Sequence, residues 1–216
     1  MTANNKFYEK LTPDNSVMLL VDHQAGLIPL VGNIAQAELK NNVLALAKVA
    51  KIFNLPTILT TSFAEGPNGP IAPELPKILP NATIIPRPGQ INAWDNPDFV
   101  KAVEKTGRKK LIIAGILTDV CVAFPAISAV AAGYDVYVVA DASGTLSNIT
   151  HDASMMRMVQ AGVIPINRFA VIAELQLDWR GNTAPEMAKL FAEHLPVYGL
   201  VIESYNTSHP QQKIAV

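Results

Sequence analysis

Short apolar segments alternate along this chain with segments of helical spacing, and this alternation constrains the fold more than any other feature. Residues 17–21 and 111–114 are continuously apolar, which is typical of strands buried on both faces. Strands separated by helices favour right-handed crossovers and a parallel sheet. The sequence therefore predicts an α/β fold, a three-layer α/β/α sandwich with a mainly parallel, doubly wound six-stranded sheet. The expected strands are 17–21, 57–61, 83–85, 111–114, 135–141 and 163–166.

Helices are expected between these strands, and the chain is expected to form one domain. Pro97 is suited to the first position of one helix. The stretch 64–80 is rich in proline and glycine, so we expect a long loop there with at most one short helical turn. A single domain is expected over 1–216, with 1–13 as an N-terminal extension and 196–216 as a C-terminal tail of little periodicity. Helical spacing also covers 43–53, 120–132, 151–161 and 185–194.

The composition is that of a globular protein without a charged surface for nucleic acid or membranes. Of the 216 residues, 50% are hydrophobic and 16% are charged, and the net charge is −1. The N-terminus lacks an apolar signal core, and no apolar run reaches the ~18 residues of a membrane span. The single cysteine, Cys121, excludes an intramolecular disulfide. We therefore expect a cytoplasmic protein that acts on a small-molecule substrate.

Three chemically complementary residues follow predicted strands: Asp22, Arg87 and Cys121. In a doubly wound sheet the ligand crevice lies at the carboxyl ends of the strands. A carboxylate can take the proton of a thiol, and a cation can hold that carboxylate. Thr118 is a good helix cap, so Cys121 is expected near the third helical position, where the helix end lowers a thiol pKa from ~8.5 toward neutrality.

Each of these residues also has an ordinary structural role open to it. Asp22 could cap the following helix, Arg87 could form a surface ion pair, and Cys121 could pack in the core. The coincidence of three strand ends favours a joint site. His23 follows Asp22 directly, and adjacent residues on a strand point apart, so we expect a structural role for it.

Three sequence blocks resemble the signature blocks of the isochorismatase-like cysteine hydrolases. They are 20–24, Arg87 with 92–94, and the more specific block 114–122. Segments 60–70, 87–95 and 141–144 are similar to the YcaC branch of that family.

The resemblance implies a catalytic triad of Asp22, Arg87 and Cys121. Arg87 stands where most members carry lysine, and a guanidinium cannot shuttle protons as an ammonium can. The resemblance also implies a cis peptide between Ile116 and Leu117, and an oxyanion hole formed by the N–H groups of Leu117 and Cys121.

No metal or cofactor is expected. Nicotinamidase-type relatives hold a metal with an Asp-x-His pair after the second strand, whereas this chain has Thr60-Thr61-Ser62-Phe63 there and its four histidines are dispersed. No glycine-rich phosphate loop follows the first strand. True isochorismatases lack the cysteine nucleophile, so Cys121 also argues against vinyl-ether hydrolysis.

The sequence thus predicts a metal-independent cysteine hydrolase that cleaves a small amide or related C–N bond through a thioester. Phe63, Asn92 and Trp94 are candidates for substrate binding. The alternative is a catalytically impaired relative that acts as a small-ligand-binding or scaffold oligomer. The apolar stretch 195–202 predicts a homo-oligomer, and the resemblance to the YcaC branch implies an octamer of two tetrameric rings.

Overall fold

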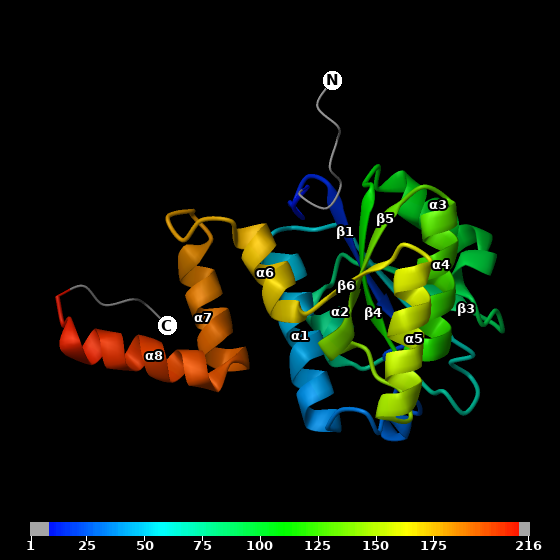
Figure 1. Ribbon diagram of the computed structural model, residues 1–216, viewed down its shortest axis with the longest axis horizontal. Coiled ribbons are helices and arrows are strands. Elements are labelled where there is room, and N and C mark those ends of the chain that lie inside the picture. The colour runs from blue at the N-terminus through cyan, green and yellow to red at the C-terminus, as the bar shows by residue number, and fades with distance from the viewer. Residues whose placement is uncertain (1–8, 212–216) are drawn as a thin grey trace.

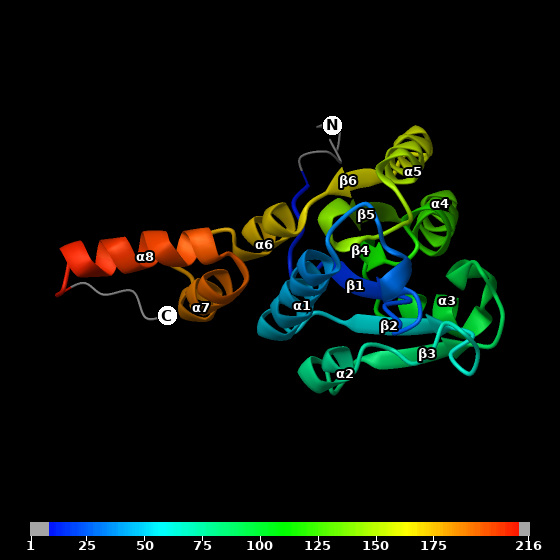
Figure 2. The same cartoon turned by 90° about the horizontal axis from the view of Figure 1, so that it is seen from below.

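Within residues 9–211, which this computed structural model describes, the centre of the molecule is a six-stranded sheet. Every strand pairing is parallel (Figure 1), and the order is β3-β2-β1-β4-β5-β6, which can be followed in Figure 2. The chain moves outward in one direction from β1 and in the other from β4, which confirms the doubly wound α/β fold. The strands are β1 (Ser16–Val21), β2 (Thr57–Ser62), β3 (Thr83–Arg87), β4 (Lys110–Gly115), β5 (Asp135–Val139) and β6 (Ile164–Ile166).

Helices cover both faces of the sheet and complete the three layers, as Figure 2 shows. One face is covered by α1 (Gln36–Ile52), with α2 (Glu74–Ile78) and α6 (Arg168–Gln176) packed beside it, and α7 (Ala184–His194) packs on α1. The other packs against α3 (Pro97–Lys105), α4 (Ala123–Ala131) and α5 (Asn148–Gln160). A last helix, α8 (Pro196–Ser208), follows α7. Short 3₁₀ turns lie at Ile28–Leu30, Ala93–Asp95 and Ala140–Ala142, and a π-turn lies at Thr118–Val122.

The continuous apolar runs are explained by this sandwich. In β1, Met18 and Leu20 join the core on the α1 side, whereas Val17, Leu19 and Val21 join the core on the α4 side. All five side chains are buried. A strand with both faces covered by helices needs apolar residues at every position, so alternation is lost.

The predicted start of α3 is confirmed. Pro97 occupies the first turn, and the side-chain oxygen of Asn96 accepts hydrogen bonds from the backbone N–H groups of Asp98 and Phe99. Asparagine is a favoured cap because its short side chain satisfies N–H groups that have no partner within the helix.

Several helix predictions were too short or missing. Helix α1 begins at Gln36 rather than at residue 43. Its first two turns were missed because, of their buried residues, Leu39 is apolar and Asn42 is polar, so the apolar spacing that marks a buried face is absent there. Helix α6 was not predicted, and β5 ends at Val139 rather than at residue 141. The expectation of a C-terminal tail without periodicity was wrong: residues 196–208 form α8, although Ile202 is its one buried residue.

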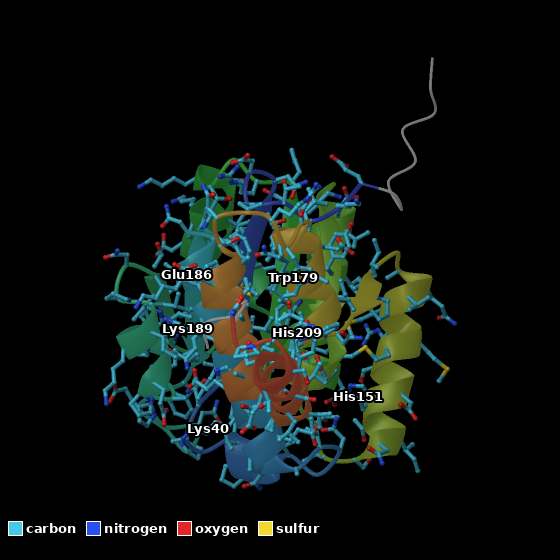
Figure 3. All side chains as sticks on the ribbon, turned by 90° about the vertical axis from the view of Figure 1, so that its left-hand side faces the viewer. Lys40, His151, Trp179, Glu186, Lys189 and His209 are labelled. Carbon is cyan, nitrogen blue, oxygen red and sulfur yellow. The ribbon has the colours of Figure 1, made fainter. Side chains whose placement is uncertain are left out.

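Helices α7 and α8 project from the side of the sandwich, and Figure 3 views the molecule nearly along α8, with His209 at its C-terminal end. Val197, Leu200 and Val201 form an exposed apolar stripe on α8, with Val197 77% exposed. Their spacing of three and four residues places them on one side of the helix. No helix in the described part of the chain is long and apolar enough to cross a membrane.

Candidate active site

The predicted site forms where the strand order reverses, between β1 and β4. Asp22 directly follows β1, and the segment carrying Cys121 directly follows β4. A Cβ atom at Gly115 would lie 2.4 Å from the carbonyl oxygen of Val21, so only glycine permits this close approach of the two strand ends. Asp22 has φ 56°, a left-handed conformation that Asp adopts more readily than most residues. This backbone turn takes Asp22 out of the strand as it enters the site.

Arg87 reaches Asp22 from the end of β3, two strands away from β1. Its Nη2 group donates hydrogen bonds to both carboxylate oxygens of Asp22, and both side chains have no exposed surface. Nε donates to Thr60 Oγ1 at 3.0 Å, and Nη1 donates to the carbonyl oxygens of Gln90 and, at 2.9 Å, Ile91. Every nitrogen of the guanidinium is therefore bonded, and Arg87 forms a buried ion pair rather than the surface pair that the sequence had left open.

Cys121 lies on the π-turn Thr118–Val122, before α4 begins at Ala123. The prediction that Thr118 caps an α-helix with Cys121 near its third position was wrong. The capping residue is Leu117, without a side-chain cap, and its carbonyl oxygen accepts from the N–H of Val122, five residues on. Such wide turns are rare and frequently occur at functional sites. The peptide bond between Ile116 and Leu117 is cis.

The loop after β5 braces this turn. Gly144 accepts a hydrogen bond from the N–H of Thr118 at 2.9 Å, and the hydroxyl of Thr145 donates to Asp119 Oδ1 at 2.6 Å. Ser143 Oγ accepts from the N–H of Gly115 at 3.3 Å. These contacts give the segment 143–145 a structural role, since it fixes the backbone that carries Cys121.

The Cys121 thiol is hydrogen-bonded to the Asp22 carboxylate, and the N–H of Leu117 also points to its sulfur. Burial, followed by the charge of Asp22, raises the pKa of the Cys121 thiol to about 12. Burial also raises the pKa of the Asp22 carboxyl, and the Arg87 charge opposes that shift. The prediction of a lowered thiol pKa was therefore wrong: at neutral pH the sulfur keeps its proton, and a carboxylate lies beside it to accept it.

The three predicted substrate-binding residues are placed differently. Phe63 follows β2, is 50% exposed, and its N–H donates to the carbonyl of Arg87 at 2.9 Å, so it lies beside the site. Asn92 caps the turn Ala93–Asp95 and its amide donates to Ser128 Oγ. Trp94 packs edge-on against Phe99 and Tyr134. Substrate contact by any of them stays a prediction.

Two residues that hold the site together were missed by the sequence analysis. Thr60 accepts from Arg87 and in turn donates to the carbonyl of Ile85. Gln24 bonds through its side chain to both the N–H and the carbonyl of Ser62, at the end of β2. Thr60 lies within the second half of β2 and Gln24 lies three residues after β1, so both are near the carboxyl edge of the sheet, but their neutral side chains gave no charge signal.

Among the described residues, no three of His, Cys, Asp and Glu are grouped so that they could hold a metal ion.

Comparison with known proteins settles the family. The isochorismatase domain model matches residues 16–168. The chain belongs to the isochorismatase family. Over 207 residues it is 54% identical to "Probable hydrolase YcaC" of Escherichia coli K12, and the match covers 96% of this chain and 99% of that protein. It is 28% identical to mouse isochorismatase domain-containing protein 2A, over 93% of this chain and 94% of that protein.

Two solved structures of YcaC proteins share the fold closely. YcaC from Pseudomonas aeruginosa, with hexane-2,5-diol and covalent acrylamide, has a TM-score of 0.90 and 54% identity, covering 92% of this chain and 98% of that one. The E. coli YcaC gene product, an octameric hydrolase of unknown specificity, has a TM-score of 0.90 and 56% identity, covering 93% and 98%. These relatives support a hydrolase function and placement in the YcaC branch.

The pH dependence of Cys121 alkylation tests the electrostatics of the site. Because burial and the Asp22 charge raise the thiol pKa, iodoacetamide should react slowly at pH 7 and faster as the pH rises, with a midpoint well above the ~8.5 of a free thiol. Asp22→Asn removes that charge and should move the midpoint to lower pH. Asp178→Asn, whose carboxylate is held by Arg180 away from the site, is the control and should leave the midpoint unchanged. An unchanged midpoint in Asp22→Asn would contradict the arrangement.

Replacing Arg87 tests the buried ion pair. Arg87→Met leaves the Asp22 carboxyl buried without its cation, and we expect a loss of about 3–5 kcal/mol in the free energy of unfolding at pH 7. Arg87→Lys should lose less, because an ammonium can face Asp22 but cannot also reach Thr60 and Ile91. Urea unfolding curves for the three proteins measure this, and equal stability of Arg87→Met and wild type would refute it.

Proposed function

We propose that this protein is a cysteine hydrolase that cleaves a small amide or a related C–N bond through a thioester intermediate. The observation that carries the proposal is the hydrogen bond between the Cys121 thiol and a carboxylate that Arg87 holds in place. A nucleophile, its base and a group that orients the base are the parts that covalent hydrolysis needs. The family membership and the hydrolase relatives support the same class.

The first half-reaction forms the thioester. Asp22 takes the proton of the Cys121 thiol as the sulfur attacks the carbonyl carbon of the substrate. The carbonyl π electrons move to the oxygen, and the N–H groups of Leu117 and Cys121 donate to this oxyanion. The contact between the Leu117 N–H and the sulfur supports this role, since the donor lies where the new bond forms. Collapse of the intermediate breaks the C–N bond, and the leaving amine takes the proton from Asp22.

The second half-reaction releases the acid. Asp22 takes a proton from water as the water oxygen attacks the thioester carbon. The C–S bond then breaks, and the sulfur recovers a proton from Asp22. Arg87 stays protonated throughout, so its role is to orient Asp22 and to favour its charged form.

With its raised pKa the Cys121 thiol is protonated at rest, so the proposed mechanism needs Asp22 to take that proton as the sulfur attacks. The Pseudomonas relative carries covalent acrylamide, a small amide that is also an electrophile. In this chain the single thiol is Cys121, so we expect acrylamide to react there too.

Substitution of Cys121 tests the proposal directly. Cys121→Ala should reduce kcat/KM for any small amide that the wild type hydrolyses by more than ~10³-fold, because no other group can form the acyl intermediate. Cys121→Ser keeps the hydrogen bond to Asp22 but is a poorer nucleophile, so it should also be strongly impaired while it still binds substrate. Wild-type rates in Cys121→Ala would refute the cysteine mechanism, whereas hydrolysis of no amide by the wild type would favour the ligand-binding or scaffold alternative.

We also propose that the chain assembles as a homo-oligomer through α8. The E. coli YcaC relative is octameric, and the stripe of Val197, Leu200 and Val201 would otherwise stay exposed to water. A second copy of this chain is the occupant that we propose for it, with the octamer as the expected assembly.

One matched pair of variants tests this assembly. Val201→Asp places a charge inside the stripe and should shift the light-scattering mass toward the 23.2 kDa monomer. Asn182→Asp adds the same charge at an exposed position before α7 and should leave the assembled mass unchanged. A wild-type mass at that of the monomer, or a full-sized assembly of Val201→Asp, would be evidence against an interface at α8.

A further inference from the structure

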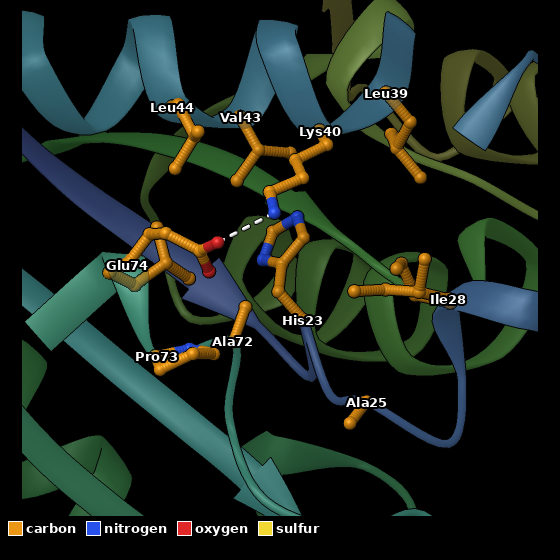
Figure 4. Close-up of a pocket in the computed structure, with 12 residues that line it drawn as sticks. His23, Ala25, Ile28, Leu39, Lys40, Val43, Leu44, Ala72, Pro73 and Glu74 are labelled. Atoms are coloured by element: carbon orange, nitrogen blue, oxygen red, sulfur yellow. Dashed lines mark hydrogen bonds and ion pairs between the residues drawn. The ribbon is translucent and has the colours of Figure 1, made fainter. Parts of the chain in front are cut away.

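His23 lies on the opposite side of the sheet from Cys121, although it directly follows Asp22. Its ring points toward α1, as Figure 4 shows, and it is 2% exposed. The expectation that His23 points away from Asp22 and Cys121 is therefore met. The ring also forms part of the wall of a cavity.

The imidazole of His23 has one used and one unused nitrogen. Nε2 lies 3.4 Å from the carbonyl oxygen of Ala142, and because a carbonyl can only accept, Nε2 carries the proton. Nδ1 is thereby a bare acceptor, and it has no hydrogen-bond partner among the described residues. Burial lowers the pKa of His23 to about 4, so the ring is neutral at physiological pH. A buried acceptor without a partner is uncommon in native structures and calls for an explanation.

The cavity beside this ring is apolar and of the size of a small molecule. Its volume is about 170 Å³, comparable to the ~150 Å³ of an engineered cavity that binds benzene. Its walls come from α1, from the segments that follow β1 and β4, and from the start of α2 with the residues before it. They include Ile28, Leu39, Val43, Leu44, Ala72 and Ile116.

Two charged residues stand at the rim of this cavity and neutralise each other. Lys40 Nζ of α1 donates to Glu74 Oε1 of α2 at 2.6 Å, and the two side chains are 51% and 35% exposed (Figure 4). Because each charge already has its partner, neither is left to bind an ion. The interior thus offers apolar contact, and the ring of His23, with its buried and unpartnered Nδ1, forms part of the wall.

We propose that this cavity is a second small-molecule site, separate from Cys121. Its ligand class is a compact, uncharged, largely apolar molecule with one hydroxyl or N–H group, which donates to His23 Nδ1. The apolar walls select against charged molecules, because a buried charge without a partner is costly. The acceptor selects for a donor, because without one it stays desolvated and unpaired.

Phenol and toluene are suitable probes because they differ by a hydroxyl in place of a methyl group. Binding of each to the full chain is measured by titration calorimetry or NMR, and the readout is the ratio of the toluene Kd to the phenol Kd. His23→Gln keeps a donor near Nε2 but places no acceptor at Nδ1, so the ratio should fall about 2–10-fold. His23→Asn places its oxygen near Nδ1 and should restore much of the preference for phenol.

Two further proteins fix the location of the probes. Ala72→Leu fills the cavity from its wall and should weaken both probes roughly tenfold or more. Protein in which iodoacetamide has blocked Cys121 should bind both probes as the unmodified protein does. Loss of binding on blocking Cys121, unchanged binding in Ala72→Leu, or a ratio that His23→Gln does not alter would each overturn the proposal. If the His23 variants do not fold, the Cys121-blocked protein and Ala72→Leu still test whether the probes bind in this cavity.

Discussion

The buried ion pair between Asp22 and Arg87 is the contact on which the site depends. Both side chains are fully buried, and burying two charges costs several kcal/mol each unless hydrogen bonds satisfy them. Here the guanidinium meets that demand with a carboxylate, a hydroxyl and two carbonyl groups. The pair ties the end of β3 to the end of β1 across β2, so the long reach of an arginine is what lets an edge strand contribute to a site at the centre of the sheet.

This ion pair also determines which of the two acidic groups, the Asp22 carboxyl or the Cys121 thiol, carries the proton. The pKa of the Cys121 thiol is raised to about 12, and that of Asp22 is raised by burial against the charge of Arg87. With Arg87 beside it, Asp22 is the better place for the negative charge, and the sulfur keeps the proton until a substrate carbonyl draws electrons from it. The proposed chemistry thus depends on a cation that touches neither the thiol nor the expected oxyanion donors.

Much of this arrangement could be predicted from the sequence, and the failures have physical causes. The strands and the meeting of Asp22, Arg87 and Cys121 follow from apolar runs and from the rule that parallel strands end at one edge. The π-turn at Thr118–Val122 could not be predicted, because Thr118 is an equally good cap for an ordinary helix and the outcome depends on distant contacts with Gly144 and Thr145. Helix α8 buries one residue, so it has no buried face that periodicity could detect.

The adjacent residues Asp22 and His23 serve opposite faces of one sheet. The left-handed backbone of Asp22 directs its carboxylate to Arg87 and Cys121, and the next residue turns its ring into the cavity below α1. The next strand end shows a related arrangement. Ile116 lines that cavity, and the backbone N–H of the following residue, Leu117, points to the sulfur. Because Arg87 and Thr60, rather than His23, fix the position of the Asp22 carboxylate, a molecule in the cavity would touch the backbone of the proposed active site without displacing its base.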